Sequence, residues 1–450
     1  MMLRSLLPLT RVRCCVRPRV AALACAGRRA LSTATRLQYV SFYNYTPIAE
    51  DHLPRLRREL HDVWSELRVL GRIYIATEGI NAQLILPASN LEAFESAVPG
   101  LYGREHLNLG ATYDAVDAKD AFVVDGVELF EKLDIRIRRQ IVADGFERGH
   151  LDLQDSGNAL PPDQWHQKLR QCLKSTASSS TNADADADTG AGAQPIHTPT
   201  ADNTNTSTNS NKNDLLLLDV RNFYEHEVGR FEGATRIMVD TFRDTFDAVD
   251  EILAKHEAEH DGEKPREVMM YCTGGIRCEK VGAYLKQYKG IDTIHKLQGG
   301  IVNYQRFLKA HPEEPSLFKG KNFVFDQRCV AGAVGGAGAE SEVLTEDVLG
   351  TCFQCGEPCN DHTNCSNLMC HGLILQCKNC ASQFLGACSE ACREQVVKMQ
   401  VMTPEDARAY RKENALRWRA SNPNAVAPPD MKYVKFRPVP PEQRLASESQ

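Results

Sequence analysis

The chain has 450 residues, which is enough for two or three domains. A quarter of the residues are charged and the net charge is -6, so no overall positive field attracts nucleic acid. Any contact with nucleic acid must therefore use a local basic patch. The sequence contains no apolar run long enough to span a bilayer, and we expect no membrane contact.

Residues 1–36 differ in composition from the rest. They contain no lysine and no acidic residue among Ala, Leu, Val and Ser, but eight arginines: Arg4, Arg11, Arg13, Arg17, Arg19, Arg28, Arg29 and Arg36. This composition is typical of a mitochondrial transit peptide and predicts a location in the mitochondrial matrix. A basic leader that carries no address would instead leave the protein in the cytoplasm. Removing the eight positive charges would change the net charge from -6 to -14.

Residues 37–145 show the alternation of strands and helices of a ferredoxin-like α+β sandwich, also called acylphosphatase-like. The predicted order is β-α-β-β-α-β, with strands at 39–43, 72–76, 82–86 and 133–142 and helices at 52–70 and 90–98. In the last strand, Arg136 and Arg138 alternate with isoleucines, and Arg139 lies beside them. These three arginines predict a phosphate-contacting stripe for RNA; the alternative is an ordinary solvated strand face.

Two segments have compositions that cannot build a core. Residues 172–212 are rich in Ser, Ala-Asp repeats, Thr and Asn, and we expect a disordered linker between the first unit and the next. Residues 421–450 are rich in proline and predict a disordered tail.

The segment around Cys272 carries the clearest chemical signal. Residues 268–271 read as a buried strand, and a helix begins near Cys278. A cysteine between them faces backbone N–H groups and the positive end of a helix, which lower a thiol pKa from about 8.5 to roughly 3.5–7.5. We therefore predict Cys272 as a nucleophile; a small buried cysteine in a turn is the alternative. The predicted active-site loop comprises Thr273, Gly274, Gly275, Ile276, Arg277 and Cys278.

The Cys-x4-Arg spacing of the loop and the motifs on either side of it restrict the kind of reaction expected at Cys272. Arg277 can anchor the loop or hold an anionic substrate, and the Cys-x4-Arg spacing is one residue shorter than the cradle of cysteine-dependent phosphatases. Together with Asp219-x-Arg221, Glu225-x-Glu227-x-Gly229 and the pair Gly299-Gly300, the loop resembles the rhodanese domain over residues 213–312. The resemblance implies an α/β domain with a parallel sheet and a persulfide-forming Cys272.

Cysteines are concentrated near the C-terminus. Nine of the sixteen lie in residues 352–392, within a predicted Cys-rich module at 320–400, and a reducing compartment favours metal binding over disulfides. The knuckles Cys352-x2-Cys355 and Cys377-x2-Cys380 have the spacing of a structural four-cysteine zinc site. A second site could use Cys359, Cys365, Cys370, Cys388 and Cys392, with His362 and His371. An iron–sulfur cluster is the alternative to zinc.

A basic stretch follows these cysteines. Residues 393–437 contain ten Lys or Arg against five acids, which predicts either a phosphate contact or a solvated helix face.

The order of these blocks is distinctive. The segment 78–82 (EGINA), the loop 272–280 (CTGGIRCEK), the segment 320–328 and the cysteine cluster resemble the rhodanese-containing tRNA uridine 34 hydroxylase family. The resemblance implies O2-dependent 5-hydroxylation of the tRNA wobble uridine, with Cys272 essential. No haem, flavin or facial-triad iron motif is visible in the sequence. The alternatives are a sulfurtransferase and a non-catalytic, zinc-bearing RNA-binding adaptor. Cys278 is either a resolving thiol or a residue of the first helical turn.

Overall fold

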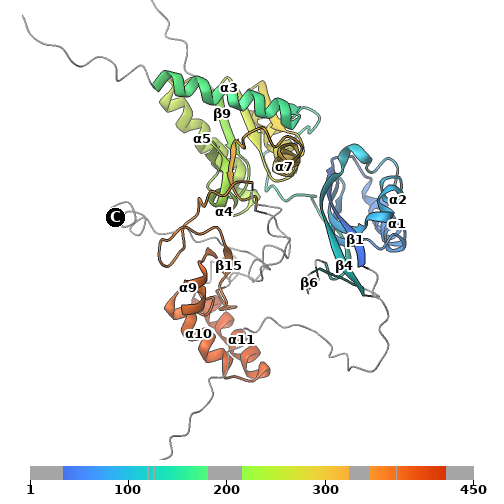
Figure 1. Ribbon diagram of the computed structural model, residues 1–450, viewed down its shortest axis with the longest axis vertical. Helices are drawn as coiled ribbons and strands as arrows, with labels where there is room; N and C mark the ends of the chain where they lie inside the picture. Colours follow the sequence, from blue (N-terminus) through green and yellow to red (C-terminus); the bar gives the residue numbers. More distant parts are fainter. Residues whose placement is uncertain are drawn as a thin grey trace, which may run out of the picture. The chain divides into compact units, whose positions relative to one another are not determined.

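The computed structural model describes residues 34–118, 121–124, 127–128, 130–180, 215–323, 344–370 and 372–421. Figure 1 shows an N-terminal sheet with α1 and α2, an α/β unit with helices around its strands, and a C-terminal group of short strands and helices. The α/β multidomain architecture is the one predicted. In the described part of the chain, no helix is long and apolar enough to cross a membrane. Residues 1–33 of the predicted leader, and the tail beyond 421, lie outside the described residues.

The N-terminal unit contains a seven-stranded sheet in the order β6-β5-β4-β1-β3-β2-β7. Its elements are β1 (Ala34–Asn44), η1 (Glu50–His52), α1 (Leu53–Glu66), β2 (Leu70–Ala76), β3 (Gly79–Pro87), η2 (Ala88–Asn90), α2 (Leu91–Glu95), η3 (Arg104–His106), β4 (Asn108–Ala118), β5 (Ala121–Val124), β6 (Val127–Glu128) and β7 (Leu133–Ile137). Residues 34–36, which the sequence analysis assigned to the leader, are the first residues of β1 and pair with β4.

One strand of the predicted sandwich was misassigned. The antiparallel order β4-β1-β3-β2 is that of a ferredoxin-like sheet, and its last strand is β4, not residues 133–142. The segment that was predicted as the last strand forms β7, which pairs in parallel with β2 at the opposite edge. β4 escaped the prediction because Gly, Ala, Asp and Asn interrupt its apolar alternation.

Helix α1 covers one face of this sheet because its apolar residues recur at helical spacing. Leu53, Leu56, Leu60 and Trp64 are buried against the strands, and the Trp64 Nε1 donates to the Tyr102 hydroxyl at 3.2 Å. Each such fully buried side chain contributes about 1.5–3 kcal/mol. The packing therefore fixes α1 rigidly over the sheet.

The central unit is a five-stranded, wholly parallel sheet in the order β11-β9-β12-β13-β8. Its elements are β8 (Asn158–Leu160), α3 (Pro162–Ser180), β9 (Leu215–Asp219), α4 (Phe223–Val228), β11 (Thr235–Arg236), η4 (Phe242–Asp244), α5 (Thr245–Glu259), β12 (Glu267–Tyr271), α6 (Ile276–Lys289), β13 (Thr293–Leu297) and α7 (Gly300–Ala310). A small antiparallel pair joins β10 (Gly229–Phe231) to β14 (Phe318–Gly320).

Both faces of this sheet are buried, which explains the unbroken apolar runs of its strands. Val268 and Met270 of β12 face a core that includes α5 and α6 residues. Met269 and Tyr271 face the opposite core, built with α3 and α7. Cys272 follows directly at the carboxyl end of β12, where ligands bind in open α/β sheets.

The predicted linker does not separate the first unit from the rhodanese-like one. β8 and α3 precede it in sequence but belong to the central sheet: Leu160 pairs with Leu297, and Trp165 is buried against Phe231 and Tyr271. Residues 172–180, assigned to the linker, continue α3. β8 was not predicted because a strand of three residues is too short to show a recognisable alternation of apolar and polar residues.

The C-terminal module contains the pair β15 (His362–Asn364) and β16 (Leu373–Leu375), followed by α9 (Lys378–Gln383), α10 (Glu390–Gln400) and α11 (Pro404–Ser421). Its small core consists largely of cysteines, with Ile374, Ala387 and Val396 among them.

Candidate active site and metal centres

In the loop between β12 and α6, the backbone amides of Gly275 and Arg277 face the Cys272 sulfur. Gly275 caps α6 with a left-handed φ of +101°, and its N–H donates to the Cys272 Sγ at 3.1 Å. A Cβ at position 275 would lie 2.8 Å from the Tyr43 hydroxyl oxygen, so the Tyr43 side chain would have to shift to accommodate it. The predicted thiolate cradle is therefore present in its geometry.

Electrostatics around the sulfur oppose the effect of burial. Cys272 is 0% exposed, and burial alone would raise its pKa. The Cys278 thiol hydrogen bond, the Arg277 charge and the amides of Arg277 and Gly275 outweigh burial and lower the pKa of Cys272 to about 6. Burial, followed by the hydrogen bond to Cys272, raises the pKa of Cys278 well above its usual value. At neutral pH, these shifts favour the thiolate of Cys272 and the neutral thiol of Cys278.

Arg277 anchors the loop. Its guanidinium makes a two-pronged ion pair with the buried Glu225, at 2.6 and 3.1 Å, and also donates to the Thr273 hydroxyl. Thr273 in turn donates to Glu225. Of the two roles considered for Arg277, the structure shows the first. The guanidinium remains close enough to Cys272 to stabilise its negative charge.

A second buried network supports the strands below the loop. Asp219 is fully buried and accepts hydrogen bonds from Arg221, His226 and Tyr271. Arg221 continues to the Gly229 carbonyl. The Asp-x-Arg motif is thus structural: it closes the end of β9 beside the end of β12.

The pair Gly299-Gly300 brings α7 against the same loop. The N–H groups of Ile301 and Val302 donate to the carbonyls of Cys272 and Thr273, each at 3.1 Å. Gly300 has a φ of +62°, and a Cβ there would lie 2.4 Å from the Cys272 carbonyl oxygen. This close approach explains the second glycine motif.

The N-terminal unit supplies residues that the sequence analysis did not assign to the site. The Tyr43 hydroxyl donates to Glu279, and the Tyr45 hydroxyl donates to the Ile276 carbonyl. Tyr43 lies near the end of β1 and Tyr45 just after it, and a single sequence offers no signal that would pair them with residues 236 and 231 positions away.

The two sequence blocks of the family resemblance meet at Lys280. Its ammonium is buried between Glu78 at 2.9 Å and Asp144 at 2.6 Å. Beside it, Glu279 binds Lys296 at 2.6 Å. The segment 78–82 therefore docks on α6, the helix that begins at the Cys272 loop.

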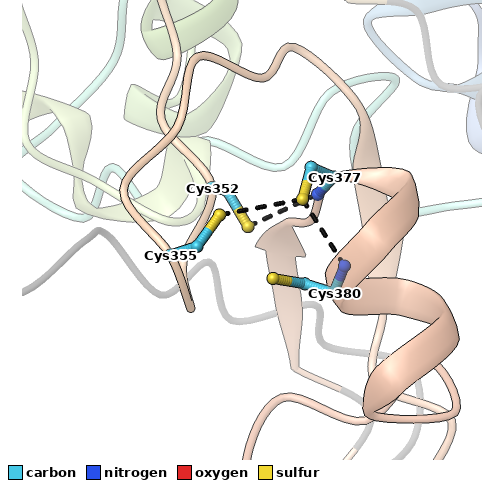
Figure 2. A group of neighbouring side chains, drawn as sticks. All are labelled: Cys352, Cys355, Cys377 and Cys380. Carbon is cyan, nitrogen blue, oxygen red and sulfur yellow. Dashed lines mark hydrogen bonds between the residues drawn. The ribbon is translucent and has the colours of Figure 1, made fainter.

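The first predicted metal set is assembled as expected. Figure 2 shows Cys352 and Cys355 facing Cys377 and Cys380, which lie at the start of α9. The four Sγ atoms lie within 4.8 Å of one another, and the pair Cys355–Cys377 is 3.7 Å apart. A tetrahedron with metal–sulfur bonds of about 2.3 Å has edges of about 3.8 Å. This set can bind a metal ion.

The structure selects four residues for a second set from the remaining candidates. Cys365, Cys370, Cys388 and Cys392 also lie within 4.8 Å of one another, with Sγ–Sγ distances of 3.7 Å and 3.6 Å from Cys388 to Cys370 and Cys392. Cys359 belongs to neither set.

The two histidines considered for the second set are not among its four residues. The His362 Nε2 lies 3.1 Å from the Tyr224 carbonyl oxygen, and His371 lies outside the described residues. The contact of His362 joins the module to α4, the helix that carries Glu225.

The three arginines predicted to contact RNA lie at the end of β7. All three are exposed; Arg136 pairs with Asp134, and the Arg138 guanidinium lies 5.3 Å from the centre of the Tyr74 ring. The structure brings them to one edge of the N-terminal sheet.

Comparisons with known proteins agree with this architecture. Residues 37–141 match the UPF0176 acylphosphatase like domain, 203–307 the rhodanese-like domain and 319–393 the rhodanase C-terminal domain. A tRNA uridine(34) hydroxylase of Photorhabdus laumondii is 35% identical over 380 residues, covering 83% of this chain and 86% of the relative. The chain belongs to the tRNA uridine(34) hydroxylase family.

Other members of the tRNA uridine(34) hydroxylase family match to a similar extent. A relative from Escherichia coli O6:K15:H31 is 34% identical over 361 residues (79% of this chain, 81% of the relative). One from Cronobacter sakazakii is 35% identical over 359 residues (79% and 82%). The family resemblance stated from the sequence is confirmed.

The lowered pKa of Cys272 predicts its pH profile. The rate of iodoacetamide alkylation, followed by mass spectrometry of the peptide, should reach half of its plateau at about pH 6, because the thiolate forms through that pH. Partial burial raises the pKa of Cys172, so its rate should still rise above about pH 9 and provides an internal control. Arg277→Gln should move the Cys272 midpoint upward by about one unit or more. A midpoint near 8.5 in the unmodified chain would show an ordinary thiol.

Proposed function

We propose that this protein hydroxylates C5 of uridine 34 in tRNA, with O2 as co-substrate and Cys272 as the essential residue. The observation that carries the proposal is the lowered pKa of Cys272 beside the amides of Gly275 and Arg277. The chain that holds it aligns over more than four-fifths of its length with a tRNA uridine(34) hydroxylase. The reaction class is that of an oxidoreductase.

The burial of Cys272 constrains how a uridine reaches it. The sulfur is fully buried, and Tyr43 of the N-terminal unit lies against Gly275. A base inside a stacked strand cannot enter such a site, so the uridine must leave its stack first, as in other enzymes that act on bases. The wobble position of an anticodon loop is suited to this because it is unpaired.

Cys272 and Cys278 can together supply the electrons that the hydroxylation requires. Hydroxylation inserts one oxygen atom of O2 into the C5–H bond and reduces the other to water, which requires two electrons and two protons. A thiolate and a thiol supply the two electrons and one of the protons when they form one disulfide, and solvent supplies the second proton. The Cys278 side chain lies close enough to Cys272 to lower the pKa of Cys272. In this proposal an external thiol reduces the disulfide after each turnover.

The metal in both four-cysteine sets is proposed to be zinc in a structural role. The short Sγ–Sγ distances fit one tetrahedral ion per set, whereas a multi-iron cluster places several metal ions between its cysteines and holds them further apart. Four cysteines leave no coordination position open for a substrate.

Mitochondrial delivery is proposed for the arginine-rich leader. The match to the family begins at residue 37 and the folded unit at residue 34, so residues 1–33 of the leader precede both. The relatives named above are bacterial proteins, in which such an address has no use.

The hydroxylation proposal predicts the effect of Cys272→Ser. Incubation of unmodified tRNA with the purified protein, O2 and a thiol should yield 5-hydroxyuridine at position 34, measured by nucleoside mass spectrometry. Cys272→Ser should lower the yield at least about 10³-fold, because the variant lacks the thiolate. Cys172→Ser, a cysteine outside the site, is the matched control. Cys278→Ser should stop turnover unless a large excess of external thiol is present, because Cys272 then has no partner for its disulfide.

A sulfurtransferase is the second candidate. The same backbone amides that face Cys272 could stabilise the negative charge of a persulfide on this residue. This second candidate predicts Cys272-dependent release of thiocyanate from thiosulfate and cyanide. Thiocyanate release without any hydroxylated nucleoside would replace the first proposal by this one.

The zinc proposal predicts two zinc ions per chain by elemental analysis. Cys355→Ser and Cys365→Ser should each lower the content to about one, because three thiolates bind zinc much more weakly than four. Cys359→Ser is the matched control, since this buried cysteine belongs to neither set, and should keep both ions. Iron in place of zinc, or loss of metal in the control, would contradict the assignment.

The leader proposal predicts that residues 1–36 direct a fluorescent reporter to mitochondria. Replacing Arg11, Arg13, Arg17 and Arg19 with glutamine should leave the reporter diffuse, because import requires the positive charge of the leader. Diffuse fluorescence of the unmodified fusion would count against the address.

A further inference from the structure

The β7 edge of the N-terminal sheet carries arginines on both of its sides. On the side away from α1, cross-strand pairing places Tyr74 beside Arg136 and Arg72 beside Asp134. Arg138 follows, with its guanidinium over the Tyr74 ring. An aromatic ring between arginines is a surface on which nucleic-acid bases stack while phosphates are bound.

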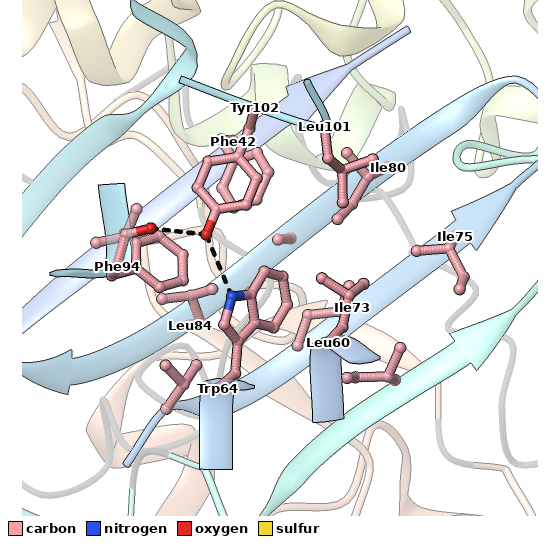
Figure 3. Packing of buried hydrophobic residues seen from close by; sticks show 14 of the residues in the cluster. Phe42, Leu60, Trp64, Ile73, Ile75, Ile80, Leu84, Phe94, Leu101 and Tyr102 are labelled. Carbon is pink, nitrogen blue, oxygen red and sulfur yellow. Dashed lines mark hydrogen bonds between the residues drawn. The ribbon is translucent and has the colours of Figure 1, made fainter. Parts of the chain in front are cut away.

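The other side of the same edge is formed by α1. Residues 54, 57, 58 and 61 share one stripe of the helix and, with Asp62 and Ile137, line a hollow of about 280 Å³. Figure 3 shows why this geometry is fixed: Leu60 and Trp64 of α1 pack on Ile73 of β2, which pairs with β7. The hollow presents the exposed side chains of Arg57 and Arg58.

Most of these charges are not neutralised within the protein. In the part of the chain that the structure describes, no carboxylate is within ion-pair distance of Arg57, Arg58 or Arg139. Among the acids near this edge, Asp134 pairs with Arg136 and Asp62 lies 3.9 Å from His61. The exposed Glu131, just before β7, is followed by the exposed Lys132. The net field at the edge is therefore positive although the whole chain is acidic.

The edge leads directly to the catalytic loop. After β7, the Ile141 N–H donates to Glu78, and Asp144 binds Lys280, two residues beyond Cys278. The six residues from Arg138 to Asp144 span at most about 20 Å. Across the sheet, Arg136, Tyr74, Asn81 and Tyr43 are successive neighbours, so about 14 Å separates Arg136 from the tyrosine that contacts the Cys272 loop.

We propose that this edge, formed by Arg57, Arg58, Arg72, Arg136, Arg138 and Arg139, binds the sugar-phosphate backbone of the substrate tRNA beside the nucleotide that enters the Cys272 loop. The identity of the RNA rests on the proposed function. Guanidinium groups bind phosphate oxygens through two parallel hydrogen bonds, and arginines on both sides of an edge strand can follow a curved backbone.

The test measures binding of a fluorescently labelled tRNA transcript by anisotropy at several salt concentrations. Two double variants, R57Q/R58Q on α1 and R138Q/R139Q beside β7, should each weaken binding about tenfold or more. Each should also reduce the slope of log affinity against log salt by about 1.5, because two phosphate contacts are lost. The matched control is R104Q/K255Q, which removes the same charge from exposed sites elsewhere and should bind as the unmodified chain does.

Catalysis separates this proposal from the one it rests on. Both double variants should raise the KM for tRNA while kcat changes less than twofold, since neither side of the edge touches Cys272. If the unmodified protein hydroxylates tRNA but both variants bind with its affinity and salt slope, the edge is excluded as the tRNA site. If the edge variants lose tRNA binding but the unmodified protein forms no 5-hydroxyuridine, the surface stands and the hydroxylase proposal fails.

Discussion

The buried ion pair between Arg277 and Glu225 is the interaction on which the rest of the site depends. It ties the loop after β12 to α4, holds a positive charge beside Cys272 and orients Thr273. Two charges removed from water are stable only as a pair, and loss of one partner typically costs about 3–5 kcal/mol. Because α4 also contacts the cysteine module through Tyr224 and His362, the same helix connects the module to the Cys272 loop.

The site is shared between domains. The rhodanese-like unit provides Cys272 and the amides that face it, while the N-terminal unit covers the loop with Tyr43 and binds Lys280 through Glu78. Neither unit alone completes the surroundings of Cys272. This division explains why motifs two hundred residues apart belong to one family signature: they are the two halves of one buried contact.

Sequence reasoning found the parts of this protein whose signals are local. Three such signals each lie within about twenty-five residues: the strand-loop-helix around Cys272, the apolar stripe of α1, and the paired knuckles that begin at Cys352 and Cys377. β4 and β8 gave no such signal, because the first is rich in small and polar residues and the second has three residues. The partners of Tyr43 and Lys280 could not be predicted from the sequence for another reason. Contacts between distant segments follow from tertiary packing, which leaves no period in a single chain.

The position of β8 and α3 has a consequence for the integrity of the central sheet. These elements lie on the N-terminal side of the segment 181–214, while the four remaining strands of the sheet lie on its C-terminal side. Hydrogen bonds between β8 and β13, and burial of Trp165 and Leu169 among α7 and β12 residues, span that segment. A chain severed there would give two polypeptides that remain associated through a shared core. The protein is thus suited to reconstitution from separately expressed fragments.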